Sequence, residues 1–125
     1  MTDNNLSYIP LHVRSCYSIN DGLQNVGDIV KKAAKLGIPA IAVTDFNNMA
    51  GFVRFYNACY GAGIKPIMGA DLQVKEDTKP GDPDRYFTVT LLAMDRQGKQ
   101  NIYDILSDAW IHTASPDIAV VAAKV

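Results

Sequence analysis

The sequence predicts a single α/β domain whose elements follow the order β-α-β-α-β-β-α. A length of 125 residues is enough for one compact domain and too short for two of ordinary size. The stretches LGIPAIAVTD and AGIKPIMGAD both run from the end of a helix through Gly and Ile into an apolar strand that ends near Asp. This repeat is typical of successive βα units with right-handed crossovers, which place their strands parallel in one sheet.

The first half of the chain carries a strand, a helix and a second strand. Apolar residues alternate with polar ones over residues 8–13, which predicts a short strand before the turn sequence NDG. From Val26 the apolar residues recur every three or four positions, so we expect an amphipathic helix that ends near Gly37. The unbroken apolar run over residues 38–45 predicts a parallel strand that is buried on both faces and ends at Asp45.

The second half repeats this pattern and adds a hairpin. Aromatic residues at helical spacing from Phe52 predict a second helix, which ends at the sequence GAG. Its aromatic side chains are expected to serve the core or an interface rather than to stack nucleic-acid bases. Strands are expected over residues 64–74 and 85–95, joined by an exposed charged loop over residues 75–84. A third helix is marked by the apolar positions Ile102, Ile105, Leu106 and Ala109.

The composition argues against several classes of protein. With 12 basic and 13 acidic residues the net charge is −1, which gives a phosphate backbone little to bind, so we expect no strong direct binding of nucleic acid. No run approaches the ~20 apolar residues of a membrane span, and the polar start lacks the features of a signal peptide. We therefore expect a cytoplasmic protein without membrane contacts. Cys16 and Cys59 form no C-x-x-C motif, so we expect reduced thiols.

A candidate metal site follows from polar residues near the expected strand ends. Side chains at i and i+2 on a strand point the same way, so His12 and Arg14 share one face. Arginine offers no lone pair, and its fixed charge repels a divalent cation. Asp21, Asp45 and Asp71 could bind Mg²⁺ or Mn²⁺ through oxygen if they converge. The residues alone favour a structural role for His12, and the carboxylates serve equally well as loop caps or turn residues.

Two long stretches of the chain carry a family resemblance. LHVRSCYSINDG, followed by GIPAIAVTDFNNMAGFVRFYNACYGAGIKPIMGADLQV, resembles the N-terminal PHP (polymerase and histidinol phosphatase) domain of the bacterial DNA polymerase III alpha subunit, in its proteobacterial form. The resemblance covers residues 8 to about 107. It implies a partial, truncated PHP-type distorted β/α barrel over residues 1–107. Residues 108–125 are then a divergent C-terminal tail, with a turn over residues 115–117.

The resemblance also identifies positions of a degenerate metal site. Metal-binding members of the family carry the motifs H-x-H-x-H-S and T-D-H-G-N and further glutamates, and several of these ligands are replaced here. Arg14 and Arg54 put fixed cations where the family has ligands, which implies no catalytic residue and no cofactor. The matched positions are Pro10, His12, Arg14, Asp21, Asp45, Phe46, Arg54 and Asp71, of which His12, Asp21, Asp45 and Asp71 could still bind residual Mg²⁺, Mn²⁺ or Zn²⁺.

For function, the resemblance implies a non-catalytic scaffold of the polymerase III core in DNA replication. Its partners would be the rest of the DNA-directed DNA polymerase, a nucleotidyltransferase, and the proofreading exonuclease subunit. An incomplete barrel leaves an edge strand uncovered, so self-association is also expected. Two alternatives stay open: an active metal-dependent phosphoesterase that uses the four residual ligands, and an inert gene fragment.

Overall fold

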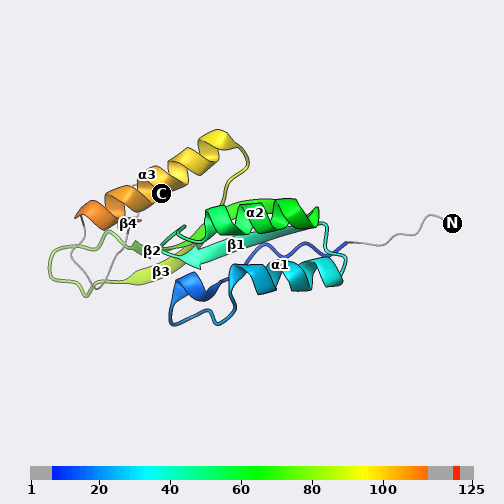
Figure 1. Ribbon diagram of the computed structural model, residues 1–125. Helices are drawn as coiled ribbons and strands as arrows, with labels where there is room; N and C mark the ends of the chain where they lie inside the picture. The colour runs from blue at the N-terminus through cyan, green and yellow to red at the C-terminus, as the bar shows by residue number, and fades with distance from the viewer. Residues whose placement is uncertain (1–6, 113–119, 122–125) are drawn as a thin grey trace.

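The strand β2 (Lys65–Lys75) is central in a four-stranded sheet in the computed structural model, which describes residues 7–112 and 120–121. β1 (Ala40–Phe46) pairs parallel with β2, and β3 (Tyr86–Leu92) pairs antiparallel with the other edge of β2. β4 (Val120–Val121) pairs parallel with the last residues of β2, beyond the point where β1 ends (Figure 1). The predicted parallel pair and the predicted hairpin are both confirmed.

The first two α-helices begin or end at a residue suited to that place. α1 (Val26–Lys35) starts after Asn25, whose side-chain oxygen accepts a hydrogen bond from a backbone N–H of the first turn at 2.9 Å. α2 (Phe52–Ala62) ends at Gly63, whose φ of 69° is a left-handed conformation that glycine adopts without strain. The third helix, α3, spans Arg96–His112. The three predicted helices are confirmed.

The three α-helices pack on one face of the sheet. The register pairs Val43 with Met68 and Leu72 with Val89, so alternate residues of all three long strands share that face. α1 and α2 cover its β1 side, and α3 covers its β2 side. The buried side chains of these two clusters are Val26, Ile29, Val30, Ala33, Ile41, Val43, Phe55, Cys59 and Ile64 on the first side, and Ala70, Leu72, Val74, Ile102, Leu106 and Ala109 on the second.

The strand expected over residues 8–13 is not a regular strand. The segment runs beside β1, where the N–H of Ala42 donates to the carbonyl of Pro10 at 2.9 Å and that of Thr44 to Val13 at 2.8 Å. The two bonded carbonyls are three residues apart in the segment, whereas the two bonded N–H groups are two residues apart in β1. This mismatch interrupts the regular ladder of strand hydrogen bonds. The N–H of Val13 donates instead to the side-chain hydroxyl of Thr44 at 3.1 Å. The prediction was wrong about regularity, because the hydroxyl of Thr44 replaces a strand carbonyl as acceptor and Pro10 has no N–H.

The α/β class is confirmed, and the chain ends differ in how far they are described. α3 continues through residue 107 to His112, and the division into a domain over 1–107 and a tail over 108–125 stays a prediction. The turn expected over 115–117 lies outside the described residues. Within residues 7–112 and 120–121, no helix is long and apolar enough to cross a membrane.

Candidate functional site

The candidate site is built around Asp71, a fully buried carboxylate in the interior of β2. Its Oδ2 atom lies 2.6 Å from Nε2 of His12 and accepts a hydrogen bond from Nε of Arg14 at 2.8 Å. Its Oδ1 atom accepts a hydrogen bond from the hydroxyl of Thr90 at 2.6 Å. Thr90 faces Asp71 because the β2–β3 register pairs the two residues directly. Both oxygens of the carboxylate are therefore occupied by donors of the protein.

Arg14 joins Asp71 to two further predicted positions. Its Nη1 atom donates to Oδ2 of Asp21 at 3.1 Å, while its Nε atom holds Asp71. The guanidinium also lies over the ring of Phe46, 5.2 Å from the ring centroid, where a cation is attracted to the π-face. One fixed cation thus bridges two carboxylates and covers an aromatic ring. Sequence spacing placed His12 and Arg14 on one face of a strand. Both side chains do contact Asp71, although the segment that carries them is not a regular strand.

The environment of Asp71 favours its ionised form. Burial by itself would raise the pKa of this carboxyl, since a low-dielectric surrounding disfavours charge. Hydrogen bonds from Thr90, His12 and Arg14, together with the positive charge of His12, outweigh burial and hold the pKa of Asp71 below its ordinary value. Asp71 is therefore ionised at neutral pH.

Asp45 lies close to Asp71 in the sheet but belongs to a different face. The register pairs Asp45 with Ala70 and Phe46 with Asp71. Neighbouring residues of a strand point to opposite faces, so the side chain of Asp45 projects to the helical face and that of Asp71 to the other. The two carboxylates that the sequence placed at neighbouring strand ends therefore do not converge.

Three hydrogen bonds hold the buried carboxylate of Asp45. Oδ1 accepts from the backbone N–H of Ser15 at 2.7 Å and from the hydroxyl of Ser18 at 2.7 Å. Oδ2 accepts from the hydroxyl of Ser15 at 2.8 Å. These serines flank and end the 3-10 helix η1 (Cys16–Ser18), so Asp45 anchors that turn to β1. Asp45 therefore has a structural role as an anchor.

The donors around Asp71 do not fit a divalent metal ion. The guanidinium of Arg14 donates to Oδ2 of Asp71, an oxygen that would have to bind the metal, and its positive charge repels a second cation. Arg54 is exposed on α2, and Pro10 contributes a backbone carbonyl to β1. In the part of the chain that the structure describes, no group of three or more His, Cys, Asp or Glu side chains could hold a metal.

Comparison with known families identifies the fold. Residues 10–122 match the family described as PHP domain. The chain belongs to the PHP-domain family.

The relatives of this PHP chain include DNA polymerase III subunits alpha. The protein from Escherichia coli K12 is 48% identical over 103 residues, which are 82% of this chain and 9% of that protein. Those from Buchnera aphidicola of Acyrthosiphon pisum and from Pseudomonas aeruginosa are 41% and 40% identical, over 86% and 84% of this chain and 9% of theirs. The predicted resemblance is confirmed. The chain spans about a tenth of the length of these relatives.

Solved structures show the same PHP-type fold. An amidohydrolase from Chromobacterium violaceum superposes with a TM-score of 0.60 at 20% identity, over 81% of this chain and 32% of its own. A proposed metal-dependent phosphoesterase from Bifidobacterium adolescentis gives a TM-score of 0.55 at 18% identity, over the same shares. At these identities the likeness concerns the fold alone, and it agrees with a partial PHP barrel.

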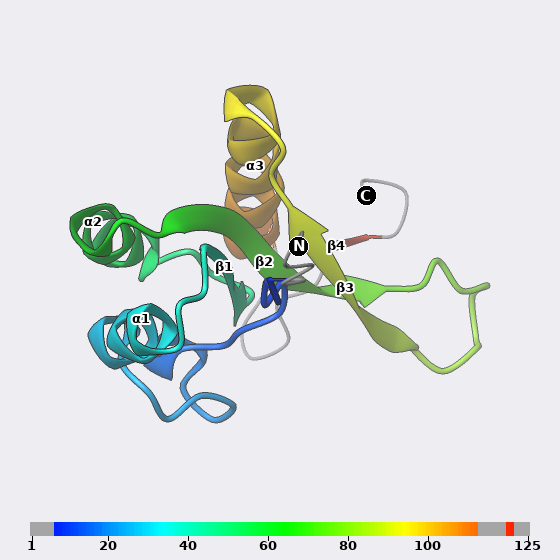
Figure 2. The ribbon, with the colours of Figure 1, turned by 90° about the vertical axis from the view of Figure 1, so that its right-hand side faces the viewer.

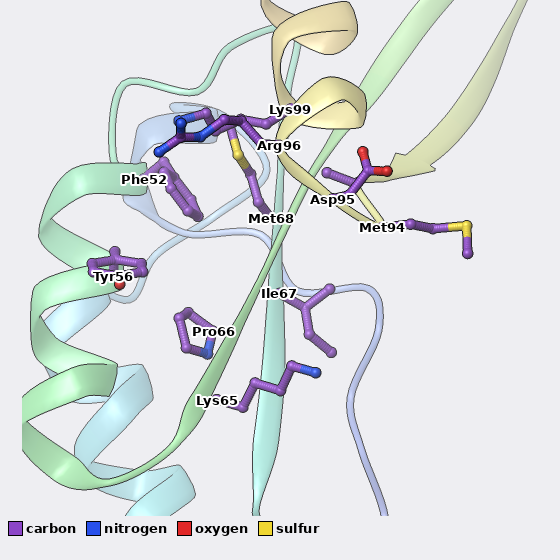
Figure 3. Close-up of a pocket in the computed structure, with 11 residues that line it drawn as sticks. Phe52, Tyr56, Lys65, Pro66, Ile67, Met68, Met94, Asp95, Arg96 and Lys99 are labelled. Atoms are coloured by element: carbon purple, nitrogen blue, oxygen red, sulfur yellow. The ribbon is translucent and has the colours of Figure 1, made fainter.

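Two cavities of similar size flank the PHP sheet. One of about 610 Å³ adjoins the candidate site and is lined by Asp21, Phe46 and Trp110 among others. The other, of about 620 Å³, lies near the start of β2, with Phe52 on α2 and Arg96 on α3 around it (Figure 3). None of the predicted site positions lines the second cavity. Of these two cavities, the first is the one that adjoins predicted site positions.

The sequence analysis missed three residues that hydrogen-bond to the carboxylates of Asp45 and Asp71. Ser15 and Ser18 bind Asp45, and Thr90 binds Asp71 across the hairpin. For the serines a signal existed, since a pair of Ser residues three apart in a turn often binds a nearby carboxylate or backbone group. For Thr90 no local signal existed, because its contact depends on the register of two strands.

Proposed function

We propose that this chain is the PHP part of a cytoplasmic DNA polymerase III alpha subunit and serves there as a non-catalytic scaffold with a degenerate metal site. In this role it supports the polymerase and binds the proofreading exonuclease subunit. The observation that carries the proposal is the contact of Arg14 with buried Asp71, with Nε 2.8 Å from Oδ2. The arginine stands where a metal-dependent enzyme of this family would need a ligand with a lone pair.

The electrostatics of the cluster support a structural role. A metal ion would supply positive charge between Asp71 and Asp21, and the guanidinium of Arg14 supplies it permanently through two ion pairs. Arginine stays protonated at any physiological pH, and its rigid fork of donors suits two carboxylates at once. Arg14 thus offsets part of the negative charge of the two carboxylates, and the chain itself supplies the cation that holds them together.

Hydrolysis of phosphoesters makes demands that this arrangement does not meet. A catalytic metal has to keep an open position for water, and several ligands have to share one face of the site. Here the carboxylate of Asp45 is bound to the backbone of the η1 turn. Of the four residual ligand candidates, His12 and Asp71 are the pair in direct contact. The proposal therefore assigns no catalytic step to this chain.

The first experiment measures metal content and activity together. The purified chain is loaded with Mn²⁺ or Zn²⁺, dialysed, and analysed for bound metal and for phosphomonoesterase activity. We expect no stoichiometric metal and no turnover. One metal per chain, with turnover that His12→Ala abolishes and Lys35→Ala preserves, would overturn the proposal in favour of a phosphoesterase. Lys35 is a suitable control because it is exposed at the end of α1 and is not one of the matched metal-site positions.

The second experiment compares the two kinds of partner. The chain is titrated with the proofreading exonuclease subunit by calorimetry, and in parallel with a fluorescent single-stranded oligonucleotide at physiological salt. The scaffold proposal predicts binding to the exonuclease. Little binding to the oligonucleotide is expected, because a net charge of −1 gives phosphates little to bind. Strongly salt-dependent oligonucleotide binding without a response to the exonuclease would contradict the scaffold, and binding to neither would favour an inert fragment.

A further inference from the structure

β3 has a free edge that no strand among the described residues occupies. The sheet order places β3 last, on the far side of β2 from β1, and Figure 2 shows it at the margin of the sheet. The N–H of Ala93 donates to Met68 at 2.8 Å, and the N–H of Glu76 donates to Arg85 at 2.9 Å. Bonded residues alternate in an antiparallel pair, so the odd-numbered residues of β3 bond to β2. The even-numbered residues direct their N–H and C=O groups to the free edge.

This edge lacks the features that usually protect an edge strand. β3 reads YFTVTLL, without a charged residue or a proline, and its pairing with β2 is continuous over all seven residues. Natural edge strands are commonly protected by charges, prolines or bulges. Tyr86 and Phe87 are 41% and 46% exposed, although both are large and apolar. A further strand would satisfy the free backbone groups and cover these side chains.

We propose that β3 pairs antiparallel with β3 of a second copy of this chain, about a two-fold axis at Val89. In this register Thr88 of one copy lies opposite Thr90 of the other, and Tyr86 lies opposite Leu92. All four are even-numbered residues whose backbone groups face the free edge, so the hydrogen bonds can form between them. The register also overlaps all seven residues of both strands, and one sheet then runs through the dimer.

The side chains of β3 favour a second copy because their pattern is similar on both sides of Val89. Threonine pairs with threonine and Phe87 pairs with Leu91, and such cross-strand pairs stabilise antiparallel sheets. At each end, Arg85 of one copy lies opposite Ala93 of the other, one position beyond the ends of the paired strands. Val89 packs against Val89 at the axis.

A cysteine cross-link tests the register directly. In a Cys16→Ser background, which removes the exposed native thiol, Val89→Cys should form a disulfide-linked dimer under mild oxidation. The two Val89 positions form a non-hydrogen-bonded pair with Cα atoms about 4.5 Å apart, which a disulfide can span. Phe87→Cys is the matched control, because its counterpart in the second copy lies four residues away, roughly 13 Å along the strand. It should cross-link only when mixed with Leu91→Cys.

A proline substitution tests whether the free edge is responsible for the association. Thr88→Pro removes an N–H that points to the free edge and leaves the hydrogen bonds to β2 intact, as proline on an edge strand can do. Sedimentation equilibrium should show a dimer for the wild type and a dissociation constant at least tenfold weaker for Thr88→Pro. Circular dichroism and thermal unfolding check that the variant is folded, and Thr78→Pro in the exposed hairpin loop is the control.

Several outcomes would overturn the proposal. A wild-type chain that stays monomeric at the highest soluble concentration contradicts it outright. A dimer that Thr88→Pro leaves unchanged, or one in which Val89→Cys and Phe87→Cys cross-link equally, contradicts the assigned surface or register. Because the cross-link is measured on the Val89→Cys chain, the test stays decisive even if the proline variant does not fold.

Discussion

Asp45 and Asp71 are one residue out of register on adjacent strands, and this offset sends their side chains to opposite faces of the sheet. Each carboxylate is fully occupied on its own face, Asp45 by the serines around η1 and Asp71 by His12, Arg14 and Thr90. The two residues therefore stabilise different parts of the fold. Predictions about either residue can be tested separately from the other.

Replacement of Asp71 should make the free energy of unfolding less dependent on pH in the acid range. The lowered pKa of Asp71 means that its ionised form stabilises the fold above the unfolded carboxyl pKa of about 3.9. This contribution is lost as pH falls through the still lower pKa of the folded state. Asp71→Asn should cost about 1.5–3 kcal/mol at pH 7, because hydrogen bonds to a charged group are lost. Urea titrations from pH 7 to pH 3 should show the gap to the wild type closing at low pH, and a constant gap would contradict the assignment.

Removal of the Arg14 guanidinium should destabilise the chain more than removal of another arginine. Arg14→Ala leaves the buried carboxylate of Asp71 without one of its donors and leaves Asp21 without its ion pair. We expect a loss of roughly 1–3 kcal/mol in the free energy of unfolding. Arg54→Ala, at an exposed position on α2, should change it by less than about 0.5 kcal/mol. Equal effects of the two substitutions on chemical denaturation would argue against a special role for Arg14.

Two glycines should respond to alanine with opposite signs. At Gly69 in β2, a Cβ atom would lie 2.5 Å from the carbonyl oxygen of Leu91 and 2.7 Å from the side chain of Leu92. Because one of these atoms is backbone, Gly69→Ala should cost about 1–3 kcal/mol through overpacking. At Gly61 in α2 a Cβ atom meets nothing within 4 Å, and alanine should stabilise the helix by about 0.5–1 kcal/mol. Thermal unfolding of both variants checks the two signs.

The two cysteines should differ strongly in reactivity. Cys16 is exposed, whereas burial removes Cys59 from solvent and raises the pKa of its thiol to about 11. Thiolate is the reactive form, so a disulfide reagent at pH 8 should label one cysteine of the native chain and two after denaturation. Cys16→Ser should abolish labelling of the native chain. Rapid labelling of that variant would show that the α2 side of the core opens readily.

The fold was largely predictable because its signals are local. The apolar periodicity of residues 26–34 and the turns at Gly37 and Gly63 depend on neighbours a few positions away in the chain. The unbroken apolar run of β1 predicted burial on both faces, which is observed. The conformation of residues 8–13 was predicted wrongly because it depends on a residue far away in the sequence. The N–H of Val13 donates to the hydroxyl of Thr44, 31 residues along the chain.

The sequence by itself determined which chemical groups the site contains: an arginine in place of a lone-pair donor, a single histidine beside it, and a carboxylate on each of two parallel strands. Only the tertiary structure decided which of them meet. A shift of one residue between β1 and β2 separates Asp45 from Asp71, and the hairpin register brings Thr90 onto Asp71. The physical reason is that strand side chains alternate between faces, so contacts across a sheet depend on pairing between segments far apart in the sequence.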